Sequence, residues 1–222
     1  MPKRVVIVGA GGFGRGVYEW LQQSPAHRER HDIVNTVFID DNFPNVQAHS
    51  RIVGTVRDYV PAANDEVIVA VGVPQLRREI VDSLLNKSVQ FHTFVDDRAV
   101  LAGNVEVGAG SVICPGTIIS ADASIGAHVH INFNCSVGHD TVLGDFSTLS
   151  PMSNVMGGTN VGAGVFVGGS AVILPRIEIG DEAIIGAGAT VVQTIANTDT
   201  VVGNPARCMN GSRVSTTGKG QA

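Results

Sequence analysis

Residues 161–191 read VGAGVFVGGSAVILPRIEIGDEAIIGAGATV, and a large aliphatic residue recurs in this stretch at every sixth position. The same spacing continues toward the N-terminus as far as Leu101, so the register holds without a break. Small or β-branched residues dominate two places before each aliphatic residue, and glycine often follows it. The aliphatic positions are Leu101, Val107, Ile113, Ile119, Ile125, Ile131, Val137, Leu143, Leu149, Val155, Val161, Val167, Ile173, Ile179, Ile185 and Val191.

A six-residue period places one large side chain inside the molecule per short strand and a small residue at each bend. Three hexads would close one triangular coil, so the repeat amounts to about five coils stacked at the ~4.8 Å spacing of paired strands. Each coil buries its aliphatic residues against the coils above and below it. Short strands of an ordinary sandwich do not require an unbroken period. We therefore predict a parallel β-helix over residues 96–210.

The first 95 residues follow a different pattern, in which strands alternate with helices. A buried strand at Arg4–Val8 runs into a glycine loop and a helical stretch through Leu21, and a second helix begins after Pro74. Further strands are predicted at 35–39, 66–71 and 89–95, and the second helix at 75–85. This order predicts a small Rossmann-like parallel sheet in an α/β domain over residues 1–95.

The glycine loop, Gly9–Gly14, matches the G-x-G-x-x-G pattern between a strand and a helix. Bare backbone at a helix N-terminus binds phosphate, and Asp40 at the end of the next strand is placed like a ribose-binding carboxylate. The domain is only one mononucleotide half, which favours a nucleotide-sugar site over a dinucleotide-dependent oxidoreductase. A purely structural role of the glycines, in helix–strand packing, stays open.

Composition excludes several other classes of protein. The chain has 222 residues, 44% of them hydrophobic and 5% aromatic, and a formal net charge of -5, which does not fit a nucleic-acid binder. No apolar stretch approaches the ~20 residues of a membrane span. Three cysteines without metal-ligand spacing, Cys114, Cys135 and Cys208, indicate reduced thiols and a cytoplasmic location. The small, polar residues 211–222 are predicted to form a disordered tail.

One histidine has a position suited to acid–base chemistry. His139 lies two residues after the inward Val137, so its side chain should face outward, and Asp140 follows directly. A histidine beside a carboxylate is a suitable general base, although an ordinary exposed histidine explains the pattern equally well. His27, His31, His49 and His92 are predicted to be solvated, and His128 and His130 to lie at the rim of the coils.

The repeat pattern resembles that of the hexapeptide-repeat acyltransferases, and this resemblance implies a left-handed β-helix and a homotrimer. The run Ile131–Asp140, with Leu143–Phe146 beyond it, is similar to the central motif of one subgroup. That subgroup contains sialic-acid O-acetyltransferases and nucleotide 4-amino-sugar N-acetyltransferases of bacterial glycan pathways, such as lipopolysaccharide O-antigen synthesis. The resemblance covers about residues 4–209, and 202–207 resemble the C-terminal segment that binds coenzyme A.

The resemblance also implies roles for individual residues. His139 would be the general base supported by Asp140, and the backbone N–H of Gly157 would bind the oxyanion. Acetyl-CoA, the only implied cofactor, would contact Asn132, Gly169, Ala187, Pro205 and Arg207. A nucleotide-linked amino sugar would contact Gly11, Gly12, Phe13, Asp40, Asp41 and Gly72. The active site would lie between adjacent subunits, and no metal is implied. Transfer would be direct, since Cys135 falls at an inward position and not at a nucleophile's position.

Two departures and two alternatives accompany this resemblance. Phe13 and Thr148 stand where family members often carry histidines, which puts one acceptor contact and one coenzyme A contact in doubt. An O-acetyltransferase for a sugar hydroxyl would use the same base. A β-helix without transferase activity, either a scaffold or a carbonic-anhydrase-like protein with zinc on His128, His130 and His139, is the alternative of another class.

Overall fold

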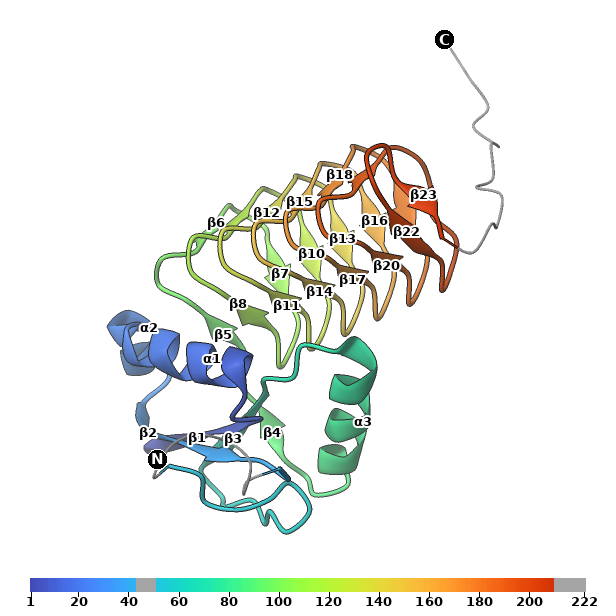
Figure 1. The fold of residues 1–222 in the computed structure, drawn as a ribbon. Helices are drawn as coiled ribbons and strands as arrows, with labels where there is room; N and C mark the ends of the chain where they lie inside the picture. Colours follow the sequence, from blue (N-terminus) through green and yellow to red (C-terminus); the bar gives the residue numbers. More distant parts are fainter. Residues whose placement is uncertain (43–50, 210–222) are drawn as a thin grey trace.

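The computed structural model describes residues 1–42 and 51–209, which form an α/β domain docked against one side of a triangular β-helix (Figure 1). The predicted tail, Gly211–Ala222, lies outside the described residues. The two fold classes expected from the sequence are both present, in the expected order.

The α/β domain is built on a four-stranded parallel sheet with the strand order β2-β1-β3-β4. Its elements in chain order are β1 (Lys3–Val8), α1 (Gly12–Gln22), α2 (Pro25–Arg30), β2 (Ile33–Ile39), β3 (Asp65–Val69), α3 (Pro74–Leu85) and β4 (Gln90–Phe91). The short helix α2 and the division of 89–95 into two strands were not predicted. β5 (Phe94–Val95) pairs with β8, so the β-helix already includes the strand just before residue 96.

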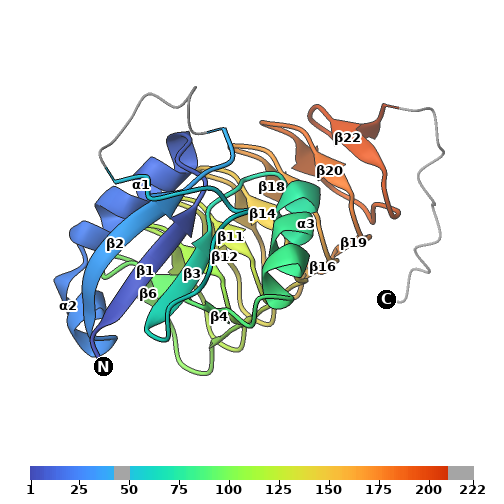
Figure 2. The ribbon, with the colours of Figure 1, turned by 90° about the horizontal axis from the view of Figure 1, so that it is seen from below.

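The two faces of this sheet bury different sets of side chains. Val5 and Ile7 of β1 pack against α1 and against the outer surface of the β-helix, while Val6 and Val8 pack against α3. This alternation is the two-residue period of a strand that is covered on both faces. Figure 2 shows α1 and α2 along one side of the strands and α3 on the other. The domain is therefore anchored to the β-helix through its own core.

The β-helix consists of two-residue strands that alternate with corners of four residues. Its strands are β6 (Val100–Leu101), β7 (Glu106–Val107), β8 (Val112–Ile113), β9 (Ile118–Ile119), β10 (Ser124–Ile125), β11 (His130–Ile131), β12 (Ser136–Val137), β13 (Val142–Leu143), β14 (Thr148–Leu149), β15 (Asn154–Val155), β16 (Asn160–Val161), β17 (Phe166–Val167), β18 (Val172–Ile173), β19 (Glu178–Ile179), β20 (Ile184–Ile185) and β21 (Thr190–Val191). A closing antiparallel pair follows, β22 (Thr200–Val202) and β23 (Arg207–Cys208).

The coils stack in a register of 18 residues, since His130 pairs with Val112 on one side and with Thr148 on the other. The second residue of each strand points inward, and the aliphatic residues of the repeat from Ile113 to Val191 are all buried. Leu101 and Val107, in the first coil, are partly buried against the same core. The six-residue prediction is thus confirmed, and the coils form the left-handed parallel β-helix that the resemblance implied.

Three sheets, parallel except for the final pair β22–β23, form the sides of this triangular prism. They are an eight-stranded sheet from β5 to β23, a six-stranded sheet from β6 to β21 and a five-stranded sheet from β7 to β19. We name the three edges between them by one residue each. The His139 corner joins the six- and five-stranded sheets, the Asp145 corner joins the five- and eight-stranded sheets, and the Gly169 corner joins the eight- and six-stranded sheets.

Two histidines predicted to be solvated are buried in the α/β domain. His27 and His92 are 1% and 2% exposed, and their Nε2 atoms lie 2.8 Å apart. The Nδ1 atom of His92 lies 2.6 Å from a carboxylate oxygen of Glu66. These residues link α2 to the sheet, and the sequence pattern missed them because it missed α2. Within the described part of the chain, no helix is long and apolar enough to cross a membrane.

Candidate active site

His139 and Asp140 form an exposed pair at the His139 corner. The imidazole Nδ1 lies 2.6 Å from Asp140 Oδ2, and the two side chains are 70% and 66% exposed. Because a carboxylate accepts the hydrogen bond, Nδ1 carries the proton and Nε2 presents a lone pair to the outside. Asp140 has φ +56°, in the left-handed region that Asp and Asn tolerate, and this turn brings its carboxylate back to the imidazole.

Gly157 lies directly beneath this imidazole, one coil further on. A Cβ atom at this position would lie 2.6 Å from His139 Nε2, so only glycine leaves room for the ring in this place. Its carbonyl accepts a hydrogen bond from Arg176, whereas its N–H donates to no acceptor in the described residues. A histidine lone pair therefore lies next to an unused backbone donor, which are the two groups that acyl transfer requires.

The Gly169 corner carries a column of small residues at the other edge of the six-stranded sheet. Gly169 and Ala187 are stacked one coil apart, with a hydrogen bond from the Gly188 N–H to the Gly169 carbonyl. The N–H groups of Gly169 and Ala187 themselves have no acceptor among the described residues. Asn132 lies at the same corner, partly buried, with its Oδ1 accepting from the Phe133 N–H at 3.1 Å.

Pro205 and Arg207 extend the Gly169 corner at the end of the β-helix. Pro205 lies in the loop between β22 and β23, and both Pro205 and Arg207 are exposed. The loop is held by hydrogen bonds between its backbone and that of Thr190. Asn132, Gly169 and Ala187 thus share one edge of the prism, and Pro205 and Arg207 follow at its end. The residues predicted for catalysis, His139, Asp140 and Gly157, occupy another edge.

The glycine loop divides into a packing part and an open part. A Cβ atom at Gly14 would lie 1.8 Å from the Gly9 carbonyl oxygen, so this glycine permits the close approach of α1 to β1. In contrast, Cβ atoms at Gly11, Gly12 and Gly72 would meet nothing within 4 Å. The packing role therefore applies to Gly14, while the open positions Gly11 and Gly12 leave space at the N-terminus of α1, where the predicted nucleotide site would lie.

The two aspartates after β2 have separate structural roles. Asp40 Oδ2 accepts from the Ala10 N–H at 2.7 Å, which places its carboxylate against the glycine loop. Asp41 Oδ1 instead accepts from the Val56 N–H at 2.7 Å, and its side chain holds the segment before β3. Of the two, Asp40 is the residue that the structure joins to the candidate phosphate loop.

The predicted rim histidines His128 and His130 are in fact buried between the two domains. They are 7% and 1% exposed, because α3 covers this side of the β-helix and inserts the fully buried side chain of Arg77. Burial, together with the charge of Arg77, lowers the pKa of His128 to about 4 and that of His130 well below its usual value. Both imidazoles are therefore neutral at pH 7.

Phe13 and Thr148, the two departures from the family pattern, both lie near Arg77. The ring of Phe13 packs on that of His130, with centroids 4.9 Å apart. Thr148 is 4% exposed, and its hydroxyl donates to the Gly72 carbonyl at 3.0 Å. Thr148 thus belongs to the contact between the domains. Arg77 is the residue of this region that the sequence analysis missed, since one arginine in an amphipathic helix gives no signal of burial.

The three histidines of the zinc alternative do not converge. His128 and His130 lie at and beside the Asp145 corner, whereas His139 lies at a different edge of the prism. Over residues 1–42 and 51–209, no group of three or more His, Cys, Asp or Glu side chains is placed to hold a metal ion. A zinc site of this composition is therefore not formed.

Neither internal cysteine is placed to act as a nucleophile. Cys114 and Cys135 are 0% and 1% exposed. Burial raises the pKa of both thiols, which disfavours the reactive thiolate. Cys135 occupies the small inward position that the repeat predicted, and its thiol contacts the Ser150 carbonyl oxygen at 3.2 Å. A covalent acyl-cysteine route therefore has no support at these positions.

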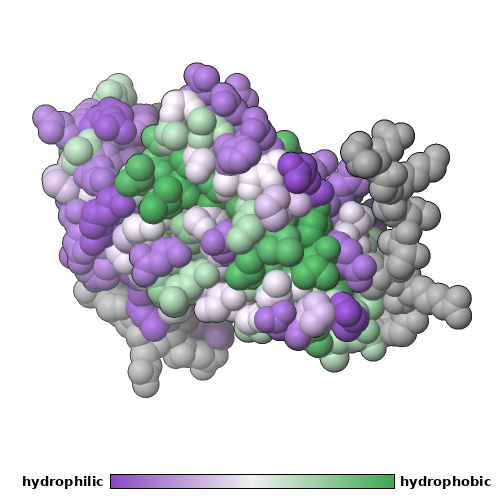
Figure 3. Space-filling view, turned by 90° about the horizontal axis from the view of Figure 1, so that it is seen from above, coloured by the Kyte–Doolittle hydropathy of each residue, from purple (hydrophilic) through white to green (hydrophobic). Residues whose placement is uncertain are grey.

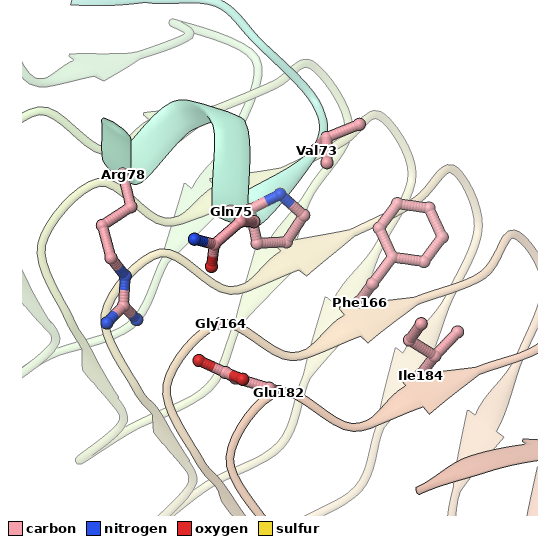
Figure 4. Close-up of a pocket in the computed structure, with 8 residues that line it drawn as sticks. Val73, Gln75, Arg78, Gly164, Phe166, Glu182 and Ile184 are labelled. Atoms are coloured by element: carbon pink, nitrogen blue, oxygen red, sulfur yellow. The ribbon is translucent and has the colours of Figure 1, made fainter. Parts of the chain in front are cut away.

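A pocket of about 570 Å³ lies between the start of α3 and the eight-stranded sheet (Figure 4). Val73, Phe166 and Ile184 form much of its apolar wall, and Arg78 and Glu182 approach it on either side of Gly164. None of the predicted site residues lines this pocket. In a single chain, this pocket and the His139 corner are therefore separate.

Sequence profiles of two families match the chain. The PglD N-terminal domain matches residues 4–84, and the bacterial transferase hexapeptide family, with six repeats, matches residues 158–193. These regions coincide with the α/β domain and with the C-terminal coils of the β-helix. No curated protein sequence gives a significant match.

Several solved structures are similar to the chain over nearly its full length. The acetyltransferase domain of PglB from Neisseria gonorrhoeae is 26% identical, with a TM-score of 0.85, and the match covers 93% of this chain and 100% of that one. WeeI from Acinetobacter baumannii is 29% identical, with a TM-score of 0.84 and the same coverage. PerB from Caulobacter crescentus, solved with CoA and GDP-perosamine, is 28% identical, with a TM-score of 0.80, and the match covers 94% and 98%.

These similarities extend over both domains in the same order, and they agree with the motif that surrounds His139 and Asp140. The resemblance seen in the sequence is thereby confirmed. The chain thus resembles, over both of its domains, hexapeptide-repeat sugar acetyltransferases with a PglD-type N-terminal domain, and it is an acyltransferase.

Proposed function

We propose that the protein transfers an acetyl group from acetyl-CoA to the 4-amino group of a nucleotide-linked amino sugar in cytoplasmic bacterial glycan synthesis. The observation that carries the proposal is the lone pair of His139 Nε2 over Gly157, whose N–H is unused. Two of the similar structures were solved with ligands of this kind, PglB with acetyl-CoA and PerB with CoA and GDP-perosamine. The α/β domain would bind the acceptor, and the β-helix the donor.

We propose a homotrimer in which the six-stranded sheet faces the three-fold axis. Its outward residues include Val100 and Ile118, which are 58% and 53% exposed. Figure 3 looks down on this side of the β-helix and shows apolar side chains bordered by polar ones. The five-stranded sheet instead presents Glu106 and Glu178, and the α/β domain covers part of the eight-stranded sheet. The six-stranded sheet is thus the side best suited to contact other subunits.

Cyclic symmetry gives this arrangement a consequence for catalysis. In a trimer, each subunit contacts its two neighbours through two different surfaces. The two edges of the six-stranded sheet are the His139 corner and the Gly169 corner, so the His139 corner of one subunit would meet the Gly169 corner of the next. The base and oxyanion donor from one subunit would then complete the donor site and glycine loop of its neighbour.

In the proposed mechanism, the acceptor nitrogen attacks the thioester carbonyl directly. His139 Nε2 takes the proton from the attacking amine, and Asp140 stabilises the imidazolium through the 2.6 Å hydrogen bond at Nδ1. The N–H of Gly157 donates to the tetrahedral oxyanion. Collapse breaks the carbon–sulfur bond, and the imidazolium returns its proton to the thiolate of CoA. Asn132 would lie beside the thioester at the adjoining corner.

The experiment is to incubate the protein with acetyl-CoA and UDP-, dTDP- and GDP-linked 4-amino sugars, with free sialic acid as the comparison. We expect release of CoA, together with an acceptor mass increased by one acetyl group, for a nucleotide-linked amino sugar. Transfer to sialic acid alone would support the O-acetyltransferase instead. No transfer to any acceptor, from a protein that retains its fold, would contradict both.

A further inference from the structure

We infer that Arg77 is a positioning residue, which holds the two loops of the acceptor site against the β-helix and thereby sets acceptor affinity. The inference rests on the proposed function for the location of the acceptor. Arg77 lies in α3, is 0% exposed and touches neither the His139 corner nor the Gly169 corner through its hydrogen bonds.

The guanidinium joins three separate parts of the chain. Toward the α/β domain, Nη1 donates to the carbonyls of Val71 and Gly72 at 2.7 and 3.3 Å. Toward the β-helix, Nε donates to the His128 carbonyl at 2.9 Å. Nη2 donates to the Phe146 and Ser147 carbonyls and to the Thr148 hydroxyl, the last at 2.9 Å. The planar fork of an arginine therefore fixes the 71–72 segment to two successive coils.

Arg77 is also connected to the glycine loop, through the side chain of His130. Arg77 Nη1 lies 3.1 Å from His130 Nδ1, and since a guanidinium only donates, Nδ1 accepts and the proton of this neutral imidazole is on Nε2. The His130 ring packs on Phe13, which follows the open positions Gly11 and Gly12. One side chain thus reaches both the glycine loop and Gly72.

The charge of Arg77 is not balanced by a carboxylate. Its hydrogen-bond partners in the described residues are carbonyls, one hydroxyl and one imidazole, and burial lowers its pKa to about 9. A hydrophobic side chain would have filled this space without that cost of desolvation. Instead, each of the three guanidinium nitrogens of Arg77 donates a hydrogen bond. This arrangement is expected where a side chain fixes the relative orientation of two domains.

Thr148→Val tests this role with little change in shape, because it removes one hydroxyl that accepts from Arg77 and donates to Gly72. Tyr59→Phe is the matched control. Tyr59 is 8% exposed, and its hydroxyl donates to an Asp65 carboxylate oxygen at 2.8 Å. Asp65 begins β3, so this hydrogen bond lies at the opposite end of the strand from residues 71–72. Arg77→Lys keeps the charge and removes the fork.

Two measurements on the full-length protein decide the matter. In hydrogen exchange, amides of residues 9–14 and 71–75 should exchange faster in Thr148→Val and Arg77→Lys than in the wild type or Tyr59→Phe. In steady-state kinetics, the KM for the acceptor should rise about fivefold or more in Thr148→Val, which removes two hydrogen bonds of the contact, and further in Arg77→Lys. The KM for acetyl-CoA should stay within about twofold of the wild type.

Unchanged hydrogen exchange in both residues 9–14 and 71–75 would overturn the inference. Equal increases in the KM for the acceptor and the KM for acetyl-CoA would also overturn it, because they would indicate a general effect on the fold. A wild-type protein that acetylates none of the acceptors would contradict the proposed function. In that case the exchange measurement alone would decide whether Arg77 positions the two loops.

Discussion

The Asp145 corner and the His139 corner have the same backbone geometry but satisfy their N–H groups differently. At the Asp145 corner, aspartate side chains supply the acceptors. Asp145 and Asp181 accept hydrogen bonds from the N–H groups of Ala127 and Ala163 at 2.7 and 2.8 Å. At the His139 corner, the equivalent N–H of Gly157 has no acceptor in the described residues, and a histidine lies above it.

This difference indicates that the side chains, and not the path of the backbone, determine at which corners an N–H group is available to a ligand. An N–H group that already donates contributes to stability, whereas an N–H group that remains unused can bind a carbonyl or an oxyanion without rearrangement. The N–H groups of Gly169 and Ala187 also lack an acceptor within residues 1–42 and 51–209, which places the Gly169 corner in the same class as the His139 corner. Changes at the open corners should therefore affect activity, and changes at the closed corner should affect stability.

The largest effect is expected from His139→Ala, which removes the base from an open corner. General bases contribute about 100- to 10,000-fold to rate, so kcat/KM should fall by at least about 100-fold. The melting temperature should stay close to that of the wild type, because the side chain is 70% exposed. A loss below about tenfold in a folded protein would remove His139 from the mechanism.

Acidification should destabilise the protein through the buried histidines His27 and His128. The pKa of His27 falls to about 3 and that of His128 to about 4, mainly through burial. Between pH 6.5 and 5 the unfolded chain therefore binds more protons than the folded chain, and stability decreases as the pH falls. The loss at pH 5 should be about 2 kcal/mol per histidine.

Thermal unfolding at pH 7.5 and pH 5 measures this effect. His128→Gln, which cannot be protonated, should reduce the difference in stability between the two pH values. An equal pH dependence in this variant and the wild type would show that His128 is not held neutral by its surroundings.

Gly157→Ala tests whether activity depends on the position of the His139 imidazole, because the imidazole is kept but displaced. The new Cβ would lie 2.6 Å from His139 Nε2, so the exposed imidazole would move away from the oxyanion site at little cost in stability. We expect kcat to fall about tenfold or more, equivalent to about 1.4 kcal/mol of transition-state stabilisation. Gly103→Ala is the matched control at the same corner of the first coil, where a Cβ meets nothing within 4 Å. Equal activity in the two variants would contradict the assignment.

The smallest effect is expected at the closed corner. Asp181→Ala leaves the Ala163 N–H without its carboxylate acceptor and should cost about 1 kcal/mol in the free energy of unfolding. Because neither residue hydrogen-bonds to Arg77 or takes part in the proposed chemistry, kcat/KM should remain that of the wild type. Chemical denaturation and steady-state assays of the same preparation measure both quantities. A large loss of activity without loss of stability would reverse the interpretation of the two corners.

The sequence predicts the β-helix well because every coil repeats the same local requirement. Each inward aliphatic residue lies in register with its equivalents 18 residues away, so the period determines which side chains are buried in the common core. The outward direction of His139 follows from the same register, and the two-residue spacing from Val137 was enough to predict it. Its role as the base remains a prediction.

The contact between the domains could not be predicted in this way. His128 and His130 occupy ordinary positions of the repeat, and nothing in the hexads indicates that α3 covers them. Arg77 looks like a surface residue of a helix, and its burial depends on carbonyls that lie more than 50 residues away in the chain. Non-local polar contacts of this kind have no period, so they appear only when the two domains are placed together.

The most direct test of the central claim mixes two inactive variants. His139→Ala damages the base, and Ala187→Trp blocks the exposed Gly169 corner, so each homotrimer should be inactive. If each active site combines the His139 corner of one subunit with the Gly169 corner of the next, trimers reassembled from equal amounts should recover about a quarter of wild-type activity. Activity no greater than that of the separate variants, in trimers shown to contain both chains, would contradict a site shared between subunits.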